Sequence, residues 1–195
     1  MILTAKQGMN ADLFPDILQL YVPQGSSVLD MTWGKGRFWQ KVPPGAYRVV
    51  GLDIDTPRDV CGDFRILPFR EESFDCAVLD PPYATHGTPM KRSIATSFNL
   101  DVGPRSYREL HILYGLGIAE AWRVLRRNGV LIIKAQDQIE SNRQVWTHAW
   151  MLDLGPGWVA EDLFVLVQKG IPAARWPYQK HARKNHSYFI VQRKK

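Results

Sequence analysis

The stretch Ser27-Val28-Leu29-Asp30-Met31-Thr32-Trp33-Gly34-Lys35-Gly36 decides the fold that we expect. Residues 27–32 predict a strand, and the two glycines predict a turn into a short helix. Glycine adopts positive φ and lets a ligand approach the backbone closely. In open α/β sheets, ligands bind beyond the carboxyl ends of the strands. The turn is therefore a candidate ligand site, although a tight strand-to-helix connection would use the same glycines.

Short apolar runs alternate with helical stretches along the rest of the chain, a pattern typical of an α/β domain with a mainly parallel sheet. Further strands are predicted at 47–53, near Val60, and at 73–79, 130–134, 163–168 and 187–192. Helices are predicted at 12–21, at 107–127 and after Ser141. No internal repeat interrupts this order, so we expect one domain over residues 1–195.

The predicted helix 107–127 has signals at both ends. Ser106 and Glu109 fit a capping box, and Asn128-Gly129 fits a helix stop. The positions expected to face the core are Ile112, Leu116, Ala119 and Val124 here, and Val145, Ala149 and Leu152 in the helix after Ser141.

The net charge of +6 is concentrated at the C-terminal end of the chain. Residues 169–195 hold eight basic side chains and no acid, whereas residues 1–168 hold 17 basic and 19 acidic groups. Such asymmetry favours a polyanionic partner, although a solvated tail would have the same composition. There is no secretory signal and no apolar run of membrane-spanning length, so we expect a cytoplasmic protein with no membrane contact. The two cysteines are too few for a disulfide framework.

Acids lie near the ends of three successive predicted strands: Asp30, Asp53 and Asp63. The turn fails the dinucleotide fingerprint because Trp39 stands where a third glycine is needed. It also fails as a Walker A loop, because Arg37 follows its last glycine. Three carboxylates would repel a pyrophosphate, but they suit a nucleoside with a cationic amino-acid arm. Each acid alone would be an ordinary turn or cap residue.

The tetrapeptide Asp80-Pro81-Pro82-Tyr83 ends the predicted strand 73–79. Prolines also serve as a rigid exit from a buried strand. Together with the glycine turn, however, the tetrapeptide resembles the S-adenosylmethionine-dependent amino-methyltransferases of nucleic acids. The resemblance covers about residues 27–192, and the segments 134–141 and 179–188 are similar to compact phage and prophage DNA methylases.

The resemblance implies a Rossmann-like class I methyltransferase fold: a seven-stranded, mostly parallel sheet with a C-terminal antiparallel hairpin and helices on both faces. It implies S-adenosylmethionine as the cofactor, with direct transfer to an exocyclic amine and no metal. The implied cofactor residues are Asp30, Met31, Thr32, Trp33, Gly34, Gly36, Asp53, Ile54, Asp63 and Phe64. In the implied catalytic set, Asp80 and the Pro81 carbonyl orient the amine, Pro82 stiffens the turn and Tyr83 stacks on the base.

Two further segments are expected to hold the nucleic acid: a mobile substrate loop at 84–105 and a basic excursion at 169–186. Cations for phosphates and aromatic rings for bases are the usual mixture at such surfaces. The candidate residues are Lys91, Arg92, Arg175, Trp176, Lys180, His181, Arg183 and Lys184. A solvated hairpin tip is the alternative. His181 and His186 have no cysteine or acid beside them, so no metal site is expected.

The main hypothesis is a DNA methyltransferase acting on adenine N6, with cytosine N4 as a second target. The alternative is an RNA base methyltransferase acting on adenine N6 or guanine N2. A non-catalytic nucleic-acid-binding module is a weaker alternative. Methylation at cytosine C5 is rejected, because it needs a nucleophilic cysteine and Cys76 is predicted to be a core thiol. No separate recognition domain is expected, so a homodimer could assist recognition.

Overall fold

The fold comes from a computed structural model that describes residues 1–82, 104, 106–169 and 180–195. The strands of the main sheet are β1 (Ala5–Gln7), β2 (Ser27–Asp30), β3 (Arg48–Asp53), β4 (Val60–Cys61), β5 (Phe74–Leu79), β6 (Leu125–Ala135), β9 (Trp158–Val167) and β10 (His186–Lys194). A separate hairpin consists of β7 (Gln138–Glu140) and β8 (Arg143–Val145). The helices are α1 (Asn10–Tyr21), the 3₁₀ helix η1 (Arg37–Lys41), α3 (Tyr107–Val124) and α4 (Thr147–Leu152).

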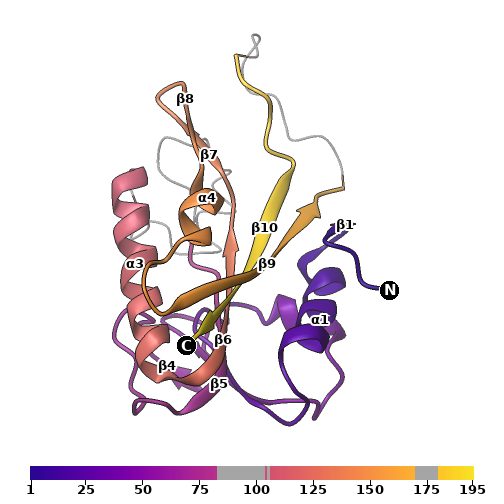
Figure 1. The fold of residues 1–195 in the computed structure, drawn as a ribbon, viewed down its shortest axis with the longest axis vertical. Helices are drawn as coiled ribbons and strands as arrows, with labels where there is room; N and C mark the ends of the chain where they lie inside the picture. Colours follow the sequence, from indigo (N-terminus) through magenta and orange to yellow (C-terminus); the bar gives the residue numbers. More distant parts are fainter. Residues whose placement is uncertain (83–103, 105, 170–179) are drawn as a thin grey trace.

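The main sheet has the order β1-β9-β10-β6-β5-β2-β3-β4 (Figure 1). Strands β2, β3, β4, β5 and β6 are parallel to their neighbours in this set, and β10 runs antiparallel to both β6 and β9. The predicted mainly parallel sheet with a C-terminal antiparallel hairpin is therefore confirmed. The carboxyl ends of β2, β3, β5 and β6 lie at one edge, called here the carboxyl edge.

Helices cover both faces of the sheet, because its strands alternate apolar side chains between two cores. Leu29 and Leu79 pack with α3, whereas Val28 and Val78 pack with α1. Figure 1 shows α1 and α3 on opposite sides of the sheet. Cys76 is fully buried in the core on the α1 face, as predicted, and Cys61 is exposed. No described helix combines the length and the apolar character needed to cross a membrane.

The described sheet has eight strands, one more than predicted. The additional strand is β1, which pairs in parallel with β9 through Ala5↔Val165. Helix α3 ends at Val124, three residues before the predicted end, because Leu125 already pairs with Phe74 of β5. Asn128 has a φ of 63° within β6, so Asn128-Gly129 bends this strand and does not stop a helix.

The predicted inward face of α3 is wrong except at Val124. Ile112 and Leu116 are 56% and 46% exposed, and Ala119 is exposed as well. The buried positions are Leu110, Tyr114, Gly117, Ile118, Ala121 and Val124. The predicted and the observed positions both fit the helical period, and the observed positions are those that face the sheet.

The helix after Ser141 is also shorter than predicted. Val145 is buried in β8, and α4 buries Thr147 and Met151 while Ala149 and Leu152 are exposed. The hairpin β7–β8 takes up the residues before Thr147, which moves the start and the inward face of the helix.

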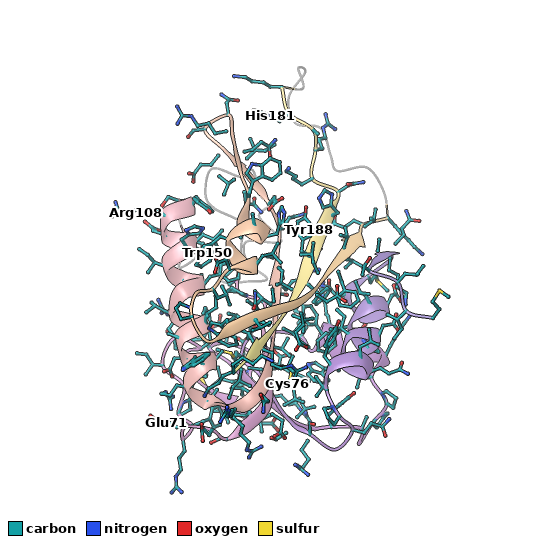
Figure 2. The ribbon with its side chains drawn as sticks, in the orientation of Figure 1. Glu71, Cys76, Arg108, Trp150, His181 and Tyr188 are labelled. Carbon is teal, nitrogen blue, oxygen red and sulfur yellow. The ribbon has the colours of Figure 1, made fainter. Side chains whose placement is uncertain are left out.

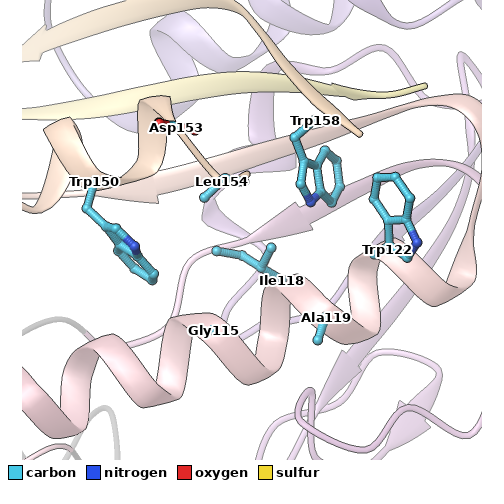
Figure 3. A pocket seen from close by; sticks show the side chains of 8 residues that line it. All are labelled: Gly115, Ile118, Ala119, Trp122, Trp150, Asp153, Leu154 and Trp158. Atoms are coloured by element: carbon cyan, nitrogen blue, oxygen red, sulfur yellow. The ribbon is translucent and has the colours of Figure 1, made fainter. Parts of the chain in front are cut away.

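A cavity of about 400 Å³ lies between α3, α4 and the start of β9 (Figure 3). It is lined by Gly115, Ile118, Ala119, Trp122, Trp150, Asp153, Leu154 and Trp158. Strand β10 is antiparallel to both β9 and β6, so β9 runs in the same direction as β6. Because Trp158 begins β9, the cavity lies toward the end of the sheet opposite the carboxyl edge.

Candidate functional site at the carboxyl edge

The glycine turn after β2 has the geometry that its sequence predicts. Gly34 and Gly36 have φ values of 53° and 61°, a left-handed region that side chains with a Cβ disfavour. The Gly34 N–H donates to Asp53 Oδ2 at the end of β3, over 2.8 Å. The turn is thus tied to the neighbouring parallel strand, and two of the predicted cofactor residues are brought into contact.

Asp53 is extensively hydrogen-bonded by the backbone. Besides the Gly34 N–H, it accepts the N–H groups of Asp55 and Thr56 at Oδ1 (2.9 and 3.1 Å). A carboxylate has about four acceptor positions, so one remains for a further donor such as a hydroxyl. Ile54, the next predicted cofactor residue, is 56% exposed beside it.

The Trp33 indole fills the space between the turn and β3. A Cβ at Gly51 would lie 2.7 Å from this ring, and one at Gly36 would lie 2.6 Å from it. The ring also stacks on Trp39, with 6.2 Å between centroids. Gly36 and Gly51 are therefore needed for the close approach of the Trp33 indole.

Met31 is a core residue, fully buried, and its N–H donates to the Val78 carbonyl.

Asp30 is a buried carboxylate, 3% exposed, at the end of β2. Its Oδ2 accepts Trp39 Nε1–H over 2.7 Å, and its Oδ1 accepts the Thr32 N–H over 3.1 Å. Burial raises the pKa of Asp30 to about 6, against the lowering effect of these two hydrogen bonds. Thr32 continues the network, since its Oγ1 accepts the Asp80 N–H over 2.8 Å.

Asp80 follows β5 directly and has the most unusual surroundings of the predicted acids. Its Oδ1 is buried and has no hydrogen-bond partner among the described residues. Burial raises the pKa of Asp80 well above its ordinary value, the charge of Lys134 lowers it, and the charge of Asp30 raises it. An acceptor is thus held in a dry position next to the Pro81 peptide.

Lys134 is a residue that the sequence analysis did not assign to the site. It is 1% exposed in β6, and its Nζ donates to Ser187 Oγ over 2.7 Å and lies 3.9 Å above the Phe189 ring. The pairing Leu79↔Ile133 brings the next residues of the parallel strands, Asp80 and Lys134, alongside each other. The signal in the sequence was a single lysine ending the apolar run 130–133.

Asp63 and Phe64 follow β4, as predicted, but Asp63 has a partner of its own. Both of its oxygens accept hydrogen bonds from the Arg65 guanidinium, and Oδ1 also accepts the Arg65 N–H. These bonds hold the pKa of Asp63 below its ordinary value. Phe64 packs on α3, where a Cβ at Gly117 would lie 3.0 Å from its ring.

A second polar network lies where β6 ends and β10 begins. Asp137 is 1% exposed and accepts hydrogen bonds from His148 N–H (3.2 Å) and Tyr188 Oη–H (3.3 Å), and its oxygens lie 2.8 Å from His148 Nδ1. His186 Nε2 lies 2.9 Å from Tyr188 Oη. His148 is thus part of a network that joins α4 to the start of β10. Burial raises the pKa of Tyr188 to about 12, together with the charge of Asp137.

Only part of the predicted nucleic-acid surface belongs to the described residues. Lys180 is exposed, and His181 Nε2 lies 2.8 Å from the Asn142 carbonyl oxygen at the tip of the β7–β8 hairpin. Lys184 Nζ lies 4.6 Å above the Trp146 ring, and Arg183 precedes it. The other predicted residues lie outside the described part of the chain: Tyr83, Lys91, Arg92, Arg175 and Trp176. The same holds for the loop 84–105 apart from Pro104, and for residues 170–179 of the basic excursion.

No protein-family model matches the sequence, and no curated protein matches it either. Three similar solved structures illustrate what the fold resembles. An S-adenosylmethionine-dependent methyltransferase from Methanosarcina mazei has a TM-score of 0.57 at 14% identity, over 91% of this chain and 96% of that one. A Burkholderia thailandensis 1,6-didemethyltoxoflavin-N1-methyltransferase, solved with S-adenosylhomocysteine, has a TM-score of 0.54 at 16% identity, over 95% and 78%. An rRNA methylase from Streptococcus thermophilus has a TM-score of 0.51 at 13% identity, over 96% and 97%.

At such low identities these likenesses concern the fold, since one fold hosts many activities. The chain has the Rossmann-like fold of the class I S-adenosylmethionine-dependent methyltransferases.

Proposed function

We propose that this chain transfers the methyl group of S-adenosylmethionine to an exocyclic amino group of a DNA base, adenine N6 in the first place and cytosine N4 in the second. The observation that carries the proposal is the buried Oδ1 of Asp80, which has no partner among the described residues. Leaving a buried acceptor unpaired costs about 1–3 kcal/mol. Such a cost is understandable where a substrate N–H completes the hydrogen bond.

The residues at the carboxyl edge fit the proposed cofactor. The left-handed glycines of the turn allow a close approach to the backbone, and Asp53 keeps an acceptor position for a ribose hydroxyl. Asp30, at the end of β2, is the acid that would face the positively charged part of the cofactor. Asp63 and Phe64 would hold the adenine by its amino group and its face. When bound, the cofactor supplies a methyl group that is activated for nucleophilic attack by the positive sulfur.

The tetrapeptide residues would act on the amine of the target base, whose lone pair is delocalised into the ring. Asp80 Oδ1 would accept one N–H, and the Pro81 carbonyl would accept the other. As the N–C bond forms, the C–S bond breaks and its electron pair goes to sulfur. Both acceptors stabilise the positive charge that develops on the nitrogen during this step. One preorganised contact of this kind is worth about 3 kcal/mol in the transition state. The surplus proton then leaves the nitrogen, and Asp80, with its raised pKa, is suited to receive it.

In this proposal the chain is a single methyltransferase domain, with 84–105 as the substrate loop and 169–186 as the basic excursion. A target within duplex DNA would have to be flipped out of the helix to reach Asp80.

An RNA base is the second candidate substrate. The likeness to an rRNA methylase over 96% of this chain favours it. The amine chemistry at Asp80 would be the same for adenine N6 or guanine N2.

The test is methyl transfer from radiolabelled S-adenosylmethionine to DNA and to RNA, followed by mass spectrometry of the nucleosides. We expect N6-methyladenine in DNA from the wild-type chain and none from Asp80→Ala. Cofactor affinity, measured by calorimetry, should stay within a few-fold, because in this proposal Asp80 Oδ1 faces the target amine, and it has no hydrogen-bond partner among the described residues. Asp153→Ala is the matched control, since this exposed carboxylate lies at the C-terminal end of α4, away from the carboxyl edge.

Label in RNA alone would select the second candidate. If neither DNA nor RNA gains label, both candidate functions are refuted. Equal loss of transfer and of cofactor affinity in Asp80→Ala would assign Asp80 to cofactor binding.

A further inference from the structure

The hairpin β7–β8 leaves the main sheet at the carboxyl edge, next to Asp80. It follows β6 after two residues, and β6 is the parallel neighbour of the strand that ends at Asp80. Figure 1 shows β7, β8 and the segment before β10 extending beyond the sheet at the same end. The sequence predicts a helix after Ser141 and does not indicate a binding role for the hairpin residues.

Contacts with other elements hold the hairpin both at its base and beside its turn, where Glu140 stands. Glu140 Oε1 accepts the N–H of Tyr107, the first residue of α3, over 2.8 Å. Gln138 and Val145 face each other across the hairpin and are 5% and 9% exposed. Asp137, just before β7, accepts the hydrogen bonds of His148 and Tyr188. A rigid support of this kind positions a tip more precisely than a free loop would.

The tip is tight and exposed. Ser141 and Asn142 form a two-residue turn between Glu140 and Arg143, with φ values of 47° and 61°. Left-handed conformations at both central positions match the twist of a short hairpin. Ser141, Asn142 and Arg143 are all exposed.

Residues 180–185 lie along this hairpin and join it at two points. His181 contacts the carbonyl of Asn142 at the tip, and Lys184 lies above the Trp146 ring just after β8. Figure 2 places His181 at the far end and Tyr188 nearer the sheet. The hairpin, Trp146 directly after it and residues 180–185 therefore form one structure, called here the projection.

The charge and the exposed ring of the projection point to its partner. Its cations are Arg143, Lys180, Arg183 and Lys184, and they outnumber its acid, Glu140, which accepts the Tyr107 N–H. Trp146 is 53% exposed although Lys184 covers part of it. Bases of unpaired strands stack on such rings while cations contact the phosphates, and this mode tolerates any sequence.

We propose that the projection binds an unpaired nucleic-acid strand, with Trp146 stacking on a base and Arg143 and Lys184 contacting phosphates beside the catalytic edge. The proposal rests on the proposed function, which it extends by naming an unpaired strand as the form of the substrate and Trp146 as the residue that receives a base. Trp146 and Arg143 are new in this role.

The experiment measures binding of the full chain to a fluorescein-labelled single-stranded DNA 20-mer by anisotropy, with the matching duplex as a second probe. Trp146→Ala should weaken single-strand binding about 5- to 150-fold, the equivalent of one lost stacking contact. Trp146→Phe should recover most of it, because it keeps an aromatic face. Ile112→Ala is the matched control, since Ile112 is an apolar side chain of similar exposure on α3.

Arg143→Ala tests the phosphate contact through its salt dependence. The slope of log affinity against log salt should fall by about 0.7 for one lost contact with a single strand. Arg127→Ala, an exposed arginine of β6 at the opposite end of the sheet, should leave the slope unchanged. Thermal unfolding of each variant shows whether it is folded.

Unchanged affinity in Trp146→Ala, or an equal loss in Ile112→Ala, would overturn the proposal. Tighter binding of an acidic peptide than of DNA would also overturn it, because the projection would then be a protein-binding surface. Methyl transfer by the wild-type chain is recorded in parallel. If transfer is normal while Trp146→Ala binds normally, the inference fails and the proposed function stands. If no polymer is methylated but the single strand is bound through Trp146, the proposed function fails instead.

Discussion

Replacing Lys134 by methionine tests whether its charge controls the ionisation of Asp80. Lys134 is almost fully buried, and burial lowers its own pKa while the charge of Asp80 raises it. Methionine has a similar length and no charge. The other groups that act on Asp80 are the carboxylate of Asp30, which raises its pKa, and the Thr32 hydroxyl, which accepts its N–H.

The direction follows from the sign of the charge. The ammonium stabilises the Asp80 carboxylate, so its removal favours the protonated form and raises the pKa of Asp80. An opposite charge near a carboxyl group shifts its pKa by about 1–3 units, and each unit corresponds to about 1.4 kcal/mol. In Lys134→Met, the low-pH limit of methyl transfer should therefore move up by about 1–3 pH units.

Removing one member of a buried pair of charges is destabilising, so thermal unfolding is measured first to show that the variant is folded. The Lys134 ammonium also donates to Ser187 Oγ, a hydrogen bond that methionine cannot make. The assay is the pH profile of transfer, together with a carbon-13 NMR titration of the aspartate carboxyl groups, in which Asp80→Asn identifies the signal. Lys134→Arg keeps the charge and should keep the profile near that of the wild type. A profile and a titration that do not move in Lys134→Met would refute the electrostatic coupling.

Three further predictions follow from burial and contacts. Gly115→Ala should raise the free energy of unfolding in urea by about 0.5–1 kcal/mol, because nothing lies within 4 Å of the new Cβ. Gly117→Ala should lower the free energy of unfolding by about 1–3 kcal/mol, because the new Cβ would lie 3.0 Å from the Phe64 ring. Because the pKa of Asp30 is about 6 when folded, the free energy of unfolding should fall by about 2 kcal/mol as the pH rises from 4 to 7, and Asp30→Asn should flatten this dependence. Arg65→Ala should free Asp63 and tighten cofactor binding in calorimetry, and a weaker binding would show that Asp63 does not hold the adenine.

The carboxyl edge could be predicted because it depends on local sequence alone. A strand, a glycine turn and an acid at each strand end suffice once the strands are known to be parallel, since parallel strands end at a common edge. The positions of Asp30, Asp53 and Asp80 follow from this rule. Strand β1 escaped prediction because three residues, one of them a lysine, are too few for a pattern.

The orientation of α3 could not be read from its own sequence. Ile112 and Leu116 satisfy the helical period as well as Leu110 and Tyr114 do. The choice depends on Gly117, whose missing side chain lets Phe64 and Leu79 approach the helix closely. A periodic pattern cannot weigh a contact of that kind, because its partners come from other elements.

Lys134 and Asp137 illustrate why the polar parts of the site escaped prediction. Both are almost fully buried, and a buried charge is costly unless other groups compensate it. The compensating groups, Ser187 and Tyr188, belong to β10, about 50 residues later in the chain. In the sequence they are isolated residues, and only the antiparallel return of β10 along β6 brings them together. That return also places residues 180–185 beside the β7–β8 hairpin, so the same strand pairing completes the surroundings of Asp80 and builds the projection above it.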